Sequence, residues 1–138
     1  MNDTGNFMLL HSDSSLEWES FQNPTDTMLP TQAMNSGGVL YSRQSETNFA
    51  HGRFHFRLLQ EGNLVLNTRD VQSNFAYEPY YNSGTDDSSN TANSGYQVVF
   101  NQTAQMYILK RNNQRMDLTM DLVPSTKDHY HRATLNFD

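Results

Sequence analysis

Cysteine is absent from this chain of 138 residues, which excludes a disulfide framework. Basic residues are scattered, with no cluster beyond the pair Lys110 and Arg111, and the formal net charge is −6. Nucleic-acid binding is therefore not expected, because it requires a basic footprint. The chain also lacks both the roughly 20-residue apolar run that crosses a bilayer and the basic, then apolar, start of a signal peptide. We expect no membrane contact by the chain itself.

Long amphipathic helices are also missing. Charged residues make up only 17% of the chain, and much of the polar remainder is Asn, Ser, Thr and Gln. Helices favour Ala, Glu, Lys and Leu, and no apolar stripe at helical spacing extends beyond one turn. The composition suits short strands with many turns, and a surface that binds neutral polar ligands.

Alternation of apolar and polar residues dominates the chain. The clearest run places Met116, Leu118, Met120 and Leu122 on one face, with polar residues between them. Side chains of a strand point alternately to its two faces, so such runs predict half-buried strands. We expect antiparallel strands at residues 6–10, 53–59, 63–68, 96–100, 105–110, 115–122 and 132–137, and almost no helix.

Two stretches break this pattern. Residues 82–95 are almost entirely Asn, Ser, Thr, Gly and Asp. They cannot bury apolar area, which predicts a mobile loop. Residues 22–38 contain Pro24, Pro30, Gly37 and Gly38 without alternation, which predicts a connection between two units.

A weak internal repeat is also present. The sequence G-N-F-M-L-L at residues 5–10 resembles G-N-L-V-L-N at residues 62–67, and residues 104–109 form a fainter third copy. Repeated hairpins of this kind suggest sheets arranged around a pseudo-symmetry axis.

Catalytic and metal-binding patterns are not found. His129 and His131 share one strand face, but zinc needs further ligands with defined geometry, and neither His51 nor His55 lies nearby in sequence. The pairs Asp86/Asp87 and Asp117/Asp121 are expected to be solvated carboxylates in a loop and on an outward strand face. No nucleophile elbow, phosphate loop or HExxH-type pattern occurs. We therefore expect no enzyme activity, no cofactor and no metal.

The most specific motif is W-E-S-F-Q-N-P-T-D-T-M-L-P-T-Q at residues 18–32. It resembles the signature W-x-S-F-x-x-P-T-D-T-x-L-P-x-Q of plant G-type lectin S-receptor-like serine/threonine kinases. Residues 52–66, G-R-F-H-F-R-L-L-Q-E-G-N-L-V-L, resemble the core of a lectin domain in that family. Residues 80–85 resemble its Y-W-x-S-G-T segment, and residues 132–138 resemble the end of its lectin region. The resemblance covers nearly the whole chain.

This resemblance implies an all-β, β-prism (bulb-type lectin) fold with short antiparallel sheets about a pseudo-threefold axis. It implies that residues 1–32 are the end of a first bulb-type lectin domain plus a linker, and that residues 33–138 are a second domain. The signature places Trp18 where one unit packs on the next, so Trp18 is expected to be buried. The chain is then an ectodomain fragment from the outer side of the plasma membrane, without the kinase domain, transmembrane helix or signal peptide of the family.

Bulb-type lectins bind mannose through the motif Q-x-D-x-N-x-V-x-Y, whose residues share one face of a strand. With Asn63 at the motif Asn, the positions here are Leu59, Glu61, Asn63, Val65 and Asn67. Leu59 cannot hydrogen-bond, and Asn67 lacks the ring and hydroxyl of Tyr. The resemblance therefore implies a degenerate carbohydrate site at Glu61, Asn63, Val65 and Asn67, and we expect no detectable binding of free mannose.

Other candidate residues lie outside this row in the sequence. Tyr77, Tyr80 and Tyr81 either contact a ligand or fill the core, as aromatic clusters do both. Asn2 and Asn101 begin N-glycosylation sequons.

The expected function is recognition of a glycan or protein ligand, including self-association of the receptor. The alternatives are a functional mannose lectin and a structural spacer in the ectodomain.

Overall fold

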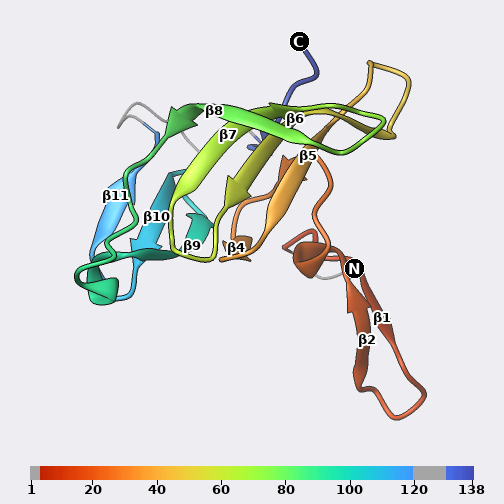
Figure 1. Ribbon diagram of the computed structural model, residues 1–138. Helices are drawn as coiled ribbons and strands as arrows, with labels where there is room; N and C mark the ends of the chain where they lie inside the picture. Colours follow the sequence, from red (N-terminus) through yellow and green to blue (C-terminus); the bar gives the residue numbers. More distant parts are fainter. Residues whose placement is uncertain (1–3, 120–129) are drawn as a thin grey trace.

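The computed structural model describes residues 4–119 and 130–138. Strands account for almost all of its regular structure (Figure 1). They are β1 (Met8–Leu10), β2 (Leu16–Glu19), β3 (Thr27–Met28), β4 (Ala33–Asn35), β5 (Val39–Arg43), β6 (His51–Leu58), β7 (Leu64–Arg69), β8 (Ala76–Asn82), β9 (Gly95–Phe100), β10 (Met106–Lys110), β11 (Arg115–Asp117) and β12 (Ala133–Thr134). Two 3-10 turns, η1 (Ser20–Gln22) and η2 (Thr91–Asn93), are the helical elements of the described residues. The chain is all-β, as predicted.

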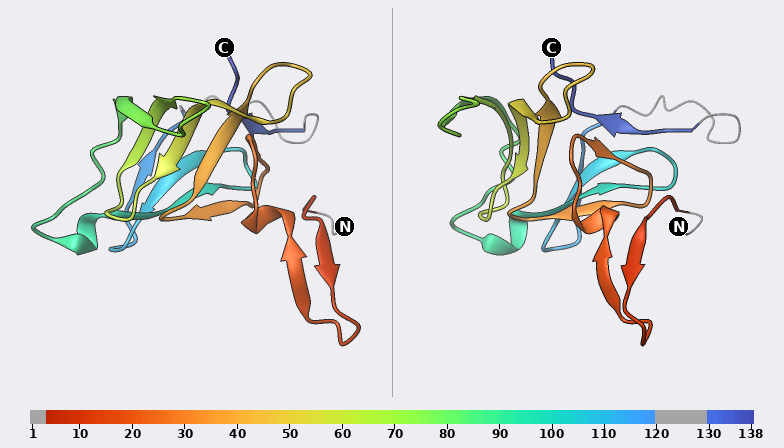
Figure 2. Two further views of the ribbon diagram at one scale, coloured as in Figure 1. Left: turned by 45° about the vertical axis from the view of Figure 1, so that its right-hand side comes forward. Right: turned by 90° about the vertical axis from the view of Figure 1, so that its right-hand side faces the viewer.

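These strands form two four-stranded sheets and two two-stranded sheets, all antiparallel. One four-stranded sheet has the order β5-β6-β7-β8, and the other has the order β11-β10-β9-β4. β12 pairs with β3 in a third, smaller sheet, and β1 pairs with β2 in a separate hairpin. Apart from that hairpin, the sheets surround one core, as the two views of Figure 2 show. This is the prism arrangement that the resemblance implies.

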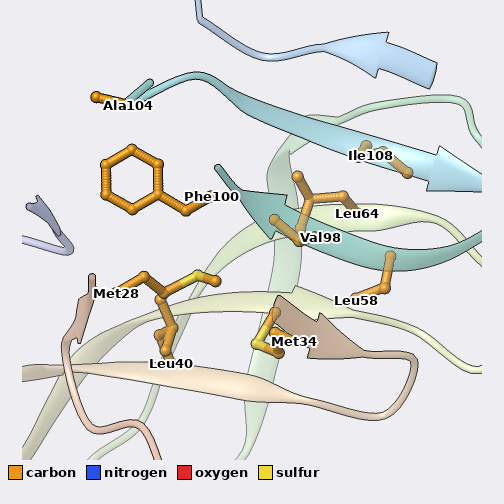
Figure 3. Close-up of a cluster of buried hydrophobic side chains, with 9 residues drawn as sticks. All are labelled: Met28, Met34, Leu40, Leu58, Leu64, Val98, Phe100, Ala104 and Ile108. Atoms are coloured by element: carbon orange, nitrogen blue, oxygen red, sulfur yellow. The ribbon is translucent and has the colours of Figure 1, made fainter. Parts of the chain in front are cut away.

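Alternation along the strands explains the core. Leu58 in β6 and Leu64 in β7 are fully buried, and they meet Val98 of β9 and Ile108 of β10 from the other four-stranded sheet. The other buried members come from β3, β4, β5, β9 and the turn before β10, and they are Met28, Met34, Leu40, Phe100 and Ala104 (Figure 3). Full burial of a large apolar side chain contributes about 1.5–3 kcal/mol, so this cluster holds the three sheets together.

The two four-stranded sheets approach each other closely at two glycines. A Cβ added to Gly62 would lie 2.3 Å from the carbonyl oxygen of Gly95, and Gly62 has a φ of +101°. Thr85 bridges the same place, because its Oγ1 donates to the Gly62 carbonyl at 2.7 Å and its carbonyl accepts from the Gly95 amide at 2.8 Å. A side chain at either glycine would clash here, so this junction fixes the start of β7 relative to β9.

The hairpin β1–β2 projects away from this body (Figures 1 and 2). Its large apolar side chains are exposed, namely Phe7, Leu9, Leu10, Leu16 and Trp18. Trp18 is 38% exposed and meets the Phe7 ring edge-on, with 6.3 Å between the ring centroids. The expectation that Trp18 is buried is wrong, because the hairpin packs on nothing that could cover it within the described residues.

Residues 22–38 are not the simple connection that the sequence predicts. They contain β3 and β4, with Met28 fully buried and Met34 at 5% exposure. β4 pairs with β9 and β3 pairs with β12, so both strands belong to the body of the chain. The Pro and Gly residues suggested a loop, so these short strands were not predicted. A division into two domains at residue 32 stays a prediction. Residues 27–32 pack on residues 33–138, the predicted second domain.

The polar segment at residues 82–95 forms a loop, but hydrogen bonds tie it down. The carboxylate of Asp87 accepts from three loop residues, Ser89, Asn90 and Asn93. These bonds lower the pKa of Asp87. Thr85 and Ser94 are buried at 2% exposure. The prediction of a mobile loop considered apolar burial alone and missed the hydrogen bonds that Asp, Asn and Ser make locally.

The predicted strands fall into two groups, according to how well their bounds agree with the structure. β6, β7, β9 and β10 confirm the predicted strands at 53–59, 63–68, 96–100 and 105–110 with small shifts at their ends. The strand predicted at 115–122 ends at Asp117 within the described part, and Met120 and Leu122 lie outside the described residues. The strand predicted at 132–137 is reduced to Ala133–Thr134.

Candidate functional site

The row predicted from the mannose motif runs along β7 and the turn before it. Glu61 is exposed, whereas Asn63, Val65 and Asn67 are 6%, 1% and 0% exposed. The last three share the face of β7 opposite to Leu64, since they alternate with it along the chain. β6 and β8 flank them on either side. The structure brings the row together but leaves only Glu61 open to solvent.

Asn63 is held by the segment that follows β8. Its Oδ1 accepts from the Ser83 hydroxyl at 2.9 Å, from the Gly84 amide at 3.0 Å and from the Thr85 amide at 3.4 Å. The Leu64 amide in turn donates to Ser83 Oγ at 2.9 Å. We call this set of bonds the Asn63 clasp. A ligand hydroxyl could use the Asn63 oxygen only by displacing part of the clasp.

Asn67 lies in a different environment. Its Nδ2 donates to the carbonyl of the next residue at 3.0 Å, but its buried Oδ1 has no partner within the described residues. His55, opposite Asn67 on β6, is 4% exposed, and both of its ring nitrogens also lack partners in the same part of the chain. Burial, aided by the positive charges of Arg69, Arg57 and His51, lowers the pKa of His55 to about 4. The neutral ring and Asn67 therefore form a patch with unmet hydrogen-bonding capacity, which is unusual in a folded interior.

The pairing of His55 with Asn67 was not predicted, although the β6–β7 hairpin itself was. Leu58 pairs with Leu64 across the turn, and counting outward along both strands leads to His55 opposite Asn67. The register of the hairpin would therefore have revealed this polar pair on the face opposite to the core.

Two of the three candidate tyrosines line a groove between the four-stranded sheets. The groove has a volume of about 560 Å³ and is lined mainly by apolar side chains, among them Phe56, Leu64, Leu66, Tyr80, Tyr81 and Met106. Tyr77 is separate, because its ring meets Phe75 edge-on with 5.4 Å between centroids. All three tyrosines are exposed. Contact of Tyr77, Tyr80 or Tyr81 with a ligand stays a prediction.

The sequon at Asn101 lies in the turn between β9 and β10. Its Oδ1 accepts from the Thr103 amide at 3.0 Å and from the Thr103 hydroxyl at 2.9 Å. The Gln105 amide donates to the same oxygen at 2.9 Å. Asn2 lies outside the described residues. Glycosylation at Asn2 and Asn101 stays a prediction.

Acidic and histidine residues do not gather into a metal site in residues 4–119 and 130–138. Asp117 is exposed and lies 3.2 Å from Arg115 in an ion pair, while its predicted counterpart Asp121 lies outside the described residues, as does His129. In the same part of the chain, no helix has the length and apolar character to span a membrane.

Comparison with known proteins matches the chain to plant receptor kinases. The G-type lectin S-receptor-like serine/threonine-protein kinase LECRK3 of Oryza sativa subsp. indica is 42% identical over 138 residues, covering 100% of this chain and 16% of the kinase. RLK1 of Arabidopsis thaliana, of the same description, is 44% identical over 120 residues, covering 82% of this chain and 14% of the kinase. The chain therefore resembles G-type lectin S-receptor-like kinases over its whole length. It spans only about 16% of the length of these rice relatives, and no protein-family model matches it.

A solved structure supports the fold independently. The Japanese Marasmius oreades lectin superimposes with a TM-score of 0.51 at 14% sequence identity, covering 80% of this chain and 74% of the lectin. At so low an identity the likeness concerns the fold alone. With the sheets described above, it confirms the lectin-type β-prism class that the sequence predicted.

Proposed function

We propose that the chain is a non-catalytic recognition module from the extracellular region of a plant receptor-like kinase, with a glycan or a protein as its ligand. Another copy of the receptor is one such protein. Similarity to lectin-type receptor kinases over the whole chain and a lectin-like fold support this role. The relatives are named as kinases, but the chain spans only about 16% of their length. Kinase activity is therefore not assigned to this segment.

The row on β7 serves the fold rather than a neutral sugar in this proposal. The observation that carries it is the Asn63 clasp, in which Oδ1 accepts three hydrogen bonds from residues 83–85. A sugar hydroxyl would have to replace these bonds, and Leu59 offers no hydrogen bond in their place. Each lost polar contact costs about 1–3 kcal/mol, and a shallow millimolar sugar site has only about 4 kcal/mol to lose. Glu61, Asn63, Val65 and Asn67 are then a degenerate mannose site.

The domain organisation is part of the same proposal. Residues 1–32 belong to the end of a first lectin domain and its linker, and residues 33–138 form a second domain. The exposure of the hairpin supports this division, since a contiguous apolar surface such as Leu9, Leu16 and Trp18 is normally covered by another unit. Extracellular placement and N-linked glycans on Asn2 and Asn101 follow from the same role.

Saturation-transfer NMR of the whole chain with methyl mannoside tests the degenerate site. We expect no saturable signal. A signal that Glu61→Gln weakens, while the matched change Glu17→Gln in the exposed hairpin leaves it intact, would restore the mannose-lectin alternative. Asn63→Ala is unsuitable for this purpose because it also breaks the clasp.

The recognition role has its own test. A glycan array and sedimentation equilibrium with the whole chain should reveal saturable binding to at least one glycan class or reversible self-association. A chain that binds no glycan and stays monomeric at high concentration would support the spacer alternative instead.

A further inference from the structure

A small pocket lies beside the junction of Gly62 and Gly95, where the two four-stranded sheets meet. It has a volume of about 160 Å³ and is formed by the β6–β7 turn, the loop that contains η2 and the turn between β10 and β11. Figures 1 and 2 show η2 close to the turn between β10 and β11. We call this cavity the turn pocket, and its lining includes Gln60, Glu61, Asp86, Asp87, Ser94 and Arg111.

One wall of the turn pocket is held in place by hydrogen bonds of its own loop. The Asp87 carboxylate accepts from the amides of Ser89 and Asn90 at 3.0 and 2.9 Å. Ser94 Oγ accepts from the Asp87 amide at 2.9 Å. The Arg111 amide donates to the Ser94 carbonyl at 3.0 Å, which ties this wall to the turn after β10. The wall is therefore ordered before a ligand binds, and this lowers the entropy cost of binding.

Other side chains of the turn pocket are not used by the fold. Within the described residues, no hydrogen bond or ion pair engages the side chains of Gln60, Glu61, Asp86 and Arg111, and all four are exposed. Carboxylates only accept hydrogen bonds, a guanidinium only donates them, and an amide side chain does both. Because the carboxylates and Arg111 line one cavity without pairing with each other, a ligand group with both a donor and an acceptor fits between them.

We propose that the turn pocket binds one N-acetylated sugar residue of a neutral glycan. This inference rests on the proposed recognition function and assigns a site and a ligand class to it. An acetamido group carries an N–H donor and a C=O acceptor, so it meets the carboxylate of Glu61 or Asp86 and the guanidinium of Arg111 at once. The Gln60 amide both donates and accepts, so it complements the same group. The volume of about 160 Å³ is below the roughly 300–1,000 Å³ of pockets for drug-sized ligands, which suits a single sugar residue.

The charges around the turn pocket argue against other sugars. An acidic sugar would be repelled by Glu61 and Asp86, and the ammonium group of a free amino sugar would be repelled by Arg111. Mannose has no acetamido group to join the two kinds of partner, in keeping with the degenerate mannose site proposed above. Asn63 does not line the turn pocket, so a ligand can bind there without displacing the Asn63 clasp.

Calorimetric titration of the whole chain with tri-N-acetylchitotriose, a neutral N-acetylated trisaccharide, tests this assignment. The matched ligand is chitotriose, which has the same backbone with free ammonium groups in place of the acetamido groups. We expect saturable binding of the acetylated form, and about tenfold weaker binding by Glu61→Gln and by Arg111→Gln, as loss of one charge-assisted contact predicts. Glu17→Gln and Arg115→Gln, at exposed positions on β2 and β11, are the matched controls and should bind like the wild-type chain.

The outcomes separate this inference from the proposed function. Equal losses in the pocket variants and in their controls would overturn the assigned site. Equal or tighter binding of chitotriose would overturn the acetamido group as the recognised feature. Failure to bind the acetylated trisaccharide, when a glycan array reveals another ligand, would overturn this inference and leave the recognition function standing, whereas a chain that neither binds a glycan nor self-associates counts against both. Thermal melting checks that each variant keeps the fold, as expected for exposed side chains without partners in the described residues.

Discussion

The hairpin β1–β2 and the strand pair β7–β8 are built by the same hydrogen bonds but lie in opposite environments. In the hairpin, Oδ1 of Asn6 accepts from the Ser20 hydroxyl at 3.1 Å, and the Phe7 amide donates to Ser20 Oγ at 2.9 Å. In the strand pair, Asn63 and Ser83 repeat this pattern at 2.9 Å, again with the amide after the Asn donating to the Ser hydroxyl at 2.9 Å. Each Asn follows a glycine with positive φ. The weak repeat in the sequence is thus a repeated clasp in the structure.

The difference between the two regions lies in the next strand. β7 has β6 on its other side and the core beneath it, whereas β1 has β2 as its one neighbour in the described residues. As a result Leu64 is fully buried, while the equivalent Phe7 is 49% exposed. A short sequence determines the clasp, but strands distant along the chain determine what the clasp buries. Stability should therefore be concentrated in the second copy.

Equivalent core and hairpin side chains give the largest contrast. We expect Leu64→Ala to lower the free energy of unfolding by about 4 kcal/mol, through lost burial and a cavity. Phe7→Ala should lower it by less than about 1 kcal/mol, because its side chain is already half in water. Urea unfolding followed by circular dichroism measures both. Similar losses in the two variants would break the comparison and show that the hairpin is packed on something in solution.

The clasp residues sharpen the comparison at the level of hydrogen bonds. Asn63→Ala should cost about 3 kcal/mol, because it removes the acceptor of three hydrogen bonds, one of them from the buried Thr85 amide. Asn6→Ala should cost about 1 kcal/mol, because the donors that it frees, at Ser20 and Phe21, are only partly buried and can bond to water. The same urea experiment measures both changes. A larger loss for Asn6→Ala than for Asn63→Ala would reverse the ranking of the two copies.

The buried histidine on β6 makes the sheet, and not the hairpin, sensitive to pH. The pKa of His55 falls from 6.5 to about 4 on folding, so between these values the unfolded chain binds more protons than the folded one. The contribution to stability is then complete above pH 6.5 and is lost as pH falls toward 4, by about 2–3 kcal/mol in total. Urea midpoints from pH 7.5 to 4.5 should fall less steeply in His55→Gln. His11→Gln, at the exposed tip of the hairpin, is the control, and equal slopes in all three proteins would contradict the assignment.

Prediction from sequence succeeded where alternation was strong. β6, β7, β9 and β10 combine alternating apolar residues with short turns, so both their existence and their pairing could be predicted. β5 and β8 were not predicted. In β8 the reason is Pro79 and exposed residues on both faces, as an edge strand allows. Short β3 and β4 contain too few residues to show a period at all.

The candidate site was predictable only in part, because its properties depend on pairing between strands. The motif aligned Asn63, Val65 and Asn67 on one face correctly, but their burial comes from the neighbouring strands and from the clasp of residues 83–85. The buried polar pair of His55 and Asn67 combines residues from β6 and β7, and no single segment of sequence contains it.

Trp18 gives the smallest expected effect and the strictest test of the hairpin. Its signature suggested a buried side chain, yet 38% of it is exposed and its ring contact is the edge of Phe7. We therefore expect Trp18→Ala to change the free energy of unfolding of this chain by less than about 1 kcal/mol. Unfolding must be followed by circular dichroism, because Trp18 is the only tryptophan and its removal abolishes that fluorescence. A loss of about 3 kcal/mol or more would show that the hairpin folds onto an apolar surface. If the same substitution is nearly neutral here but costs that much in a longer receptor segment with a preceding lectin domain, the missing neighbour of β1 lies in that domain.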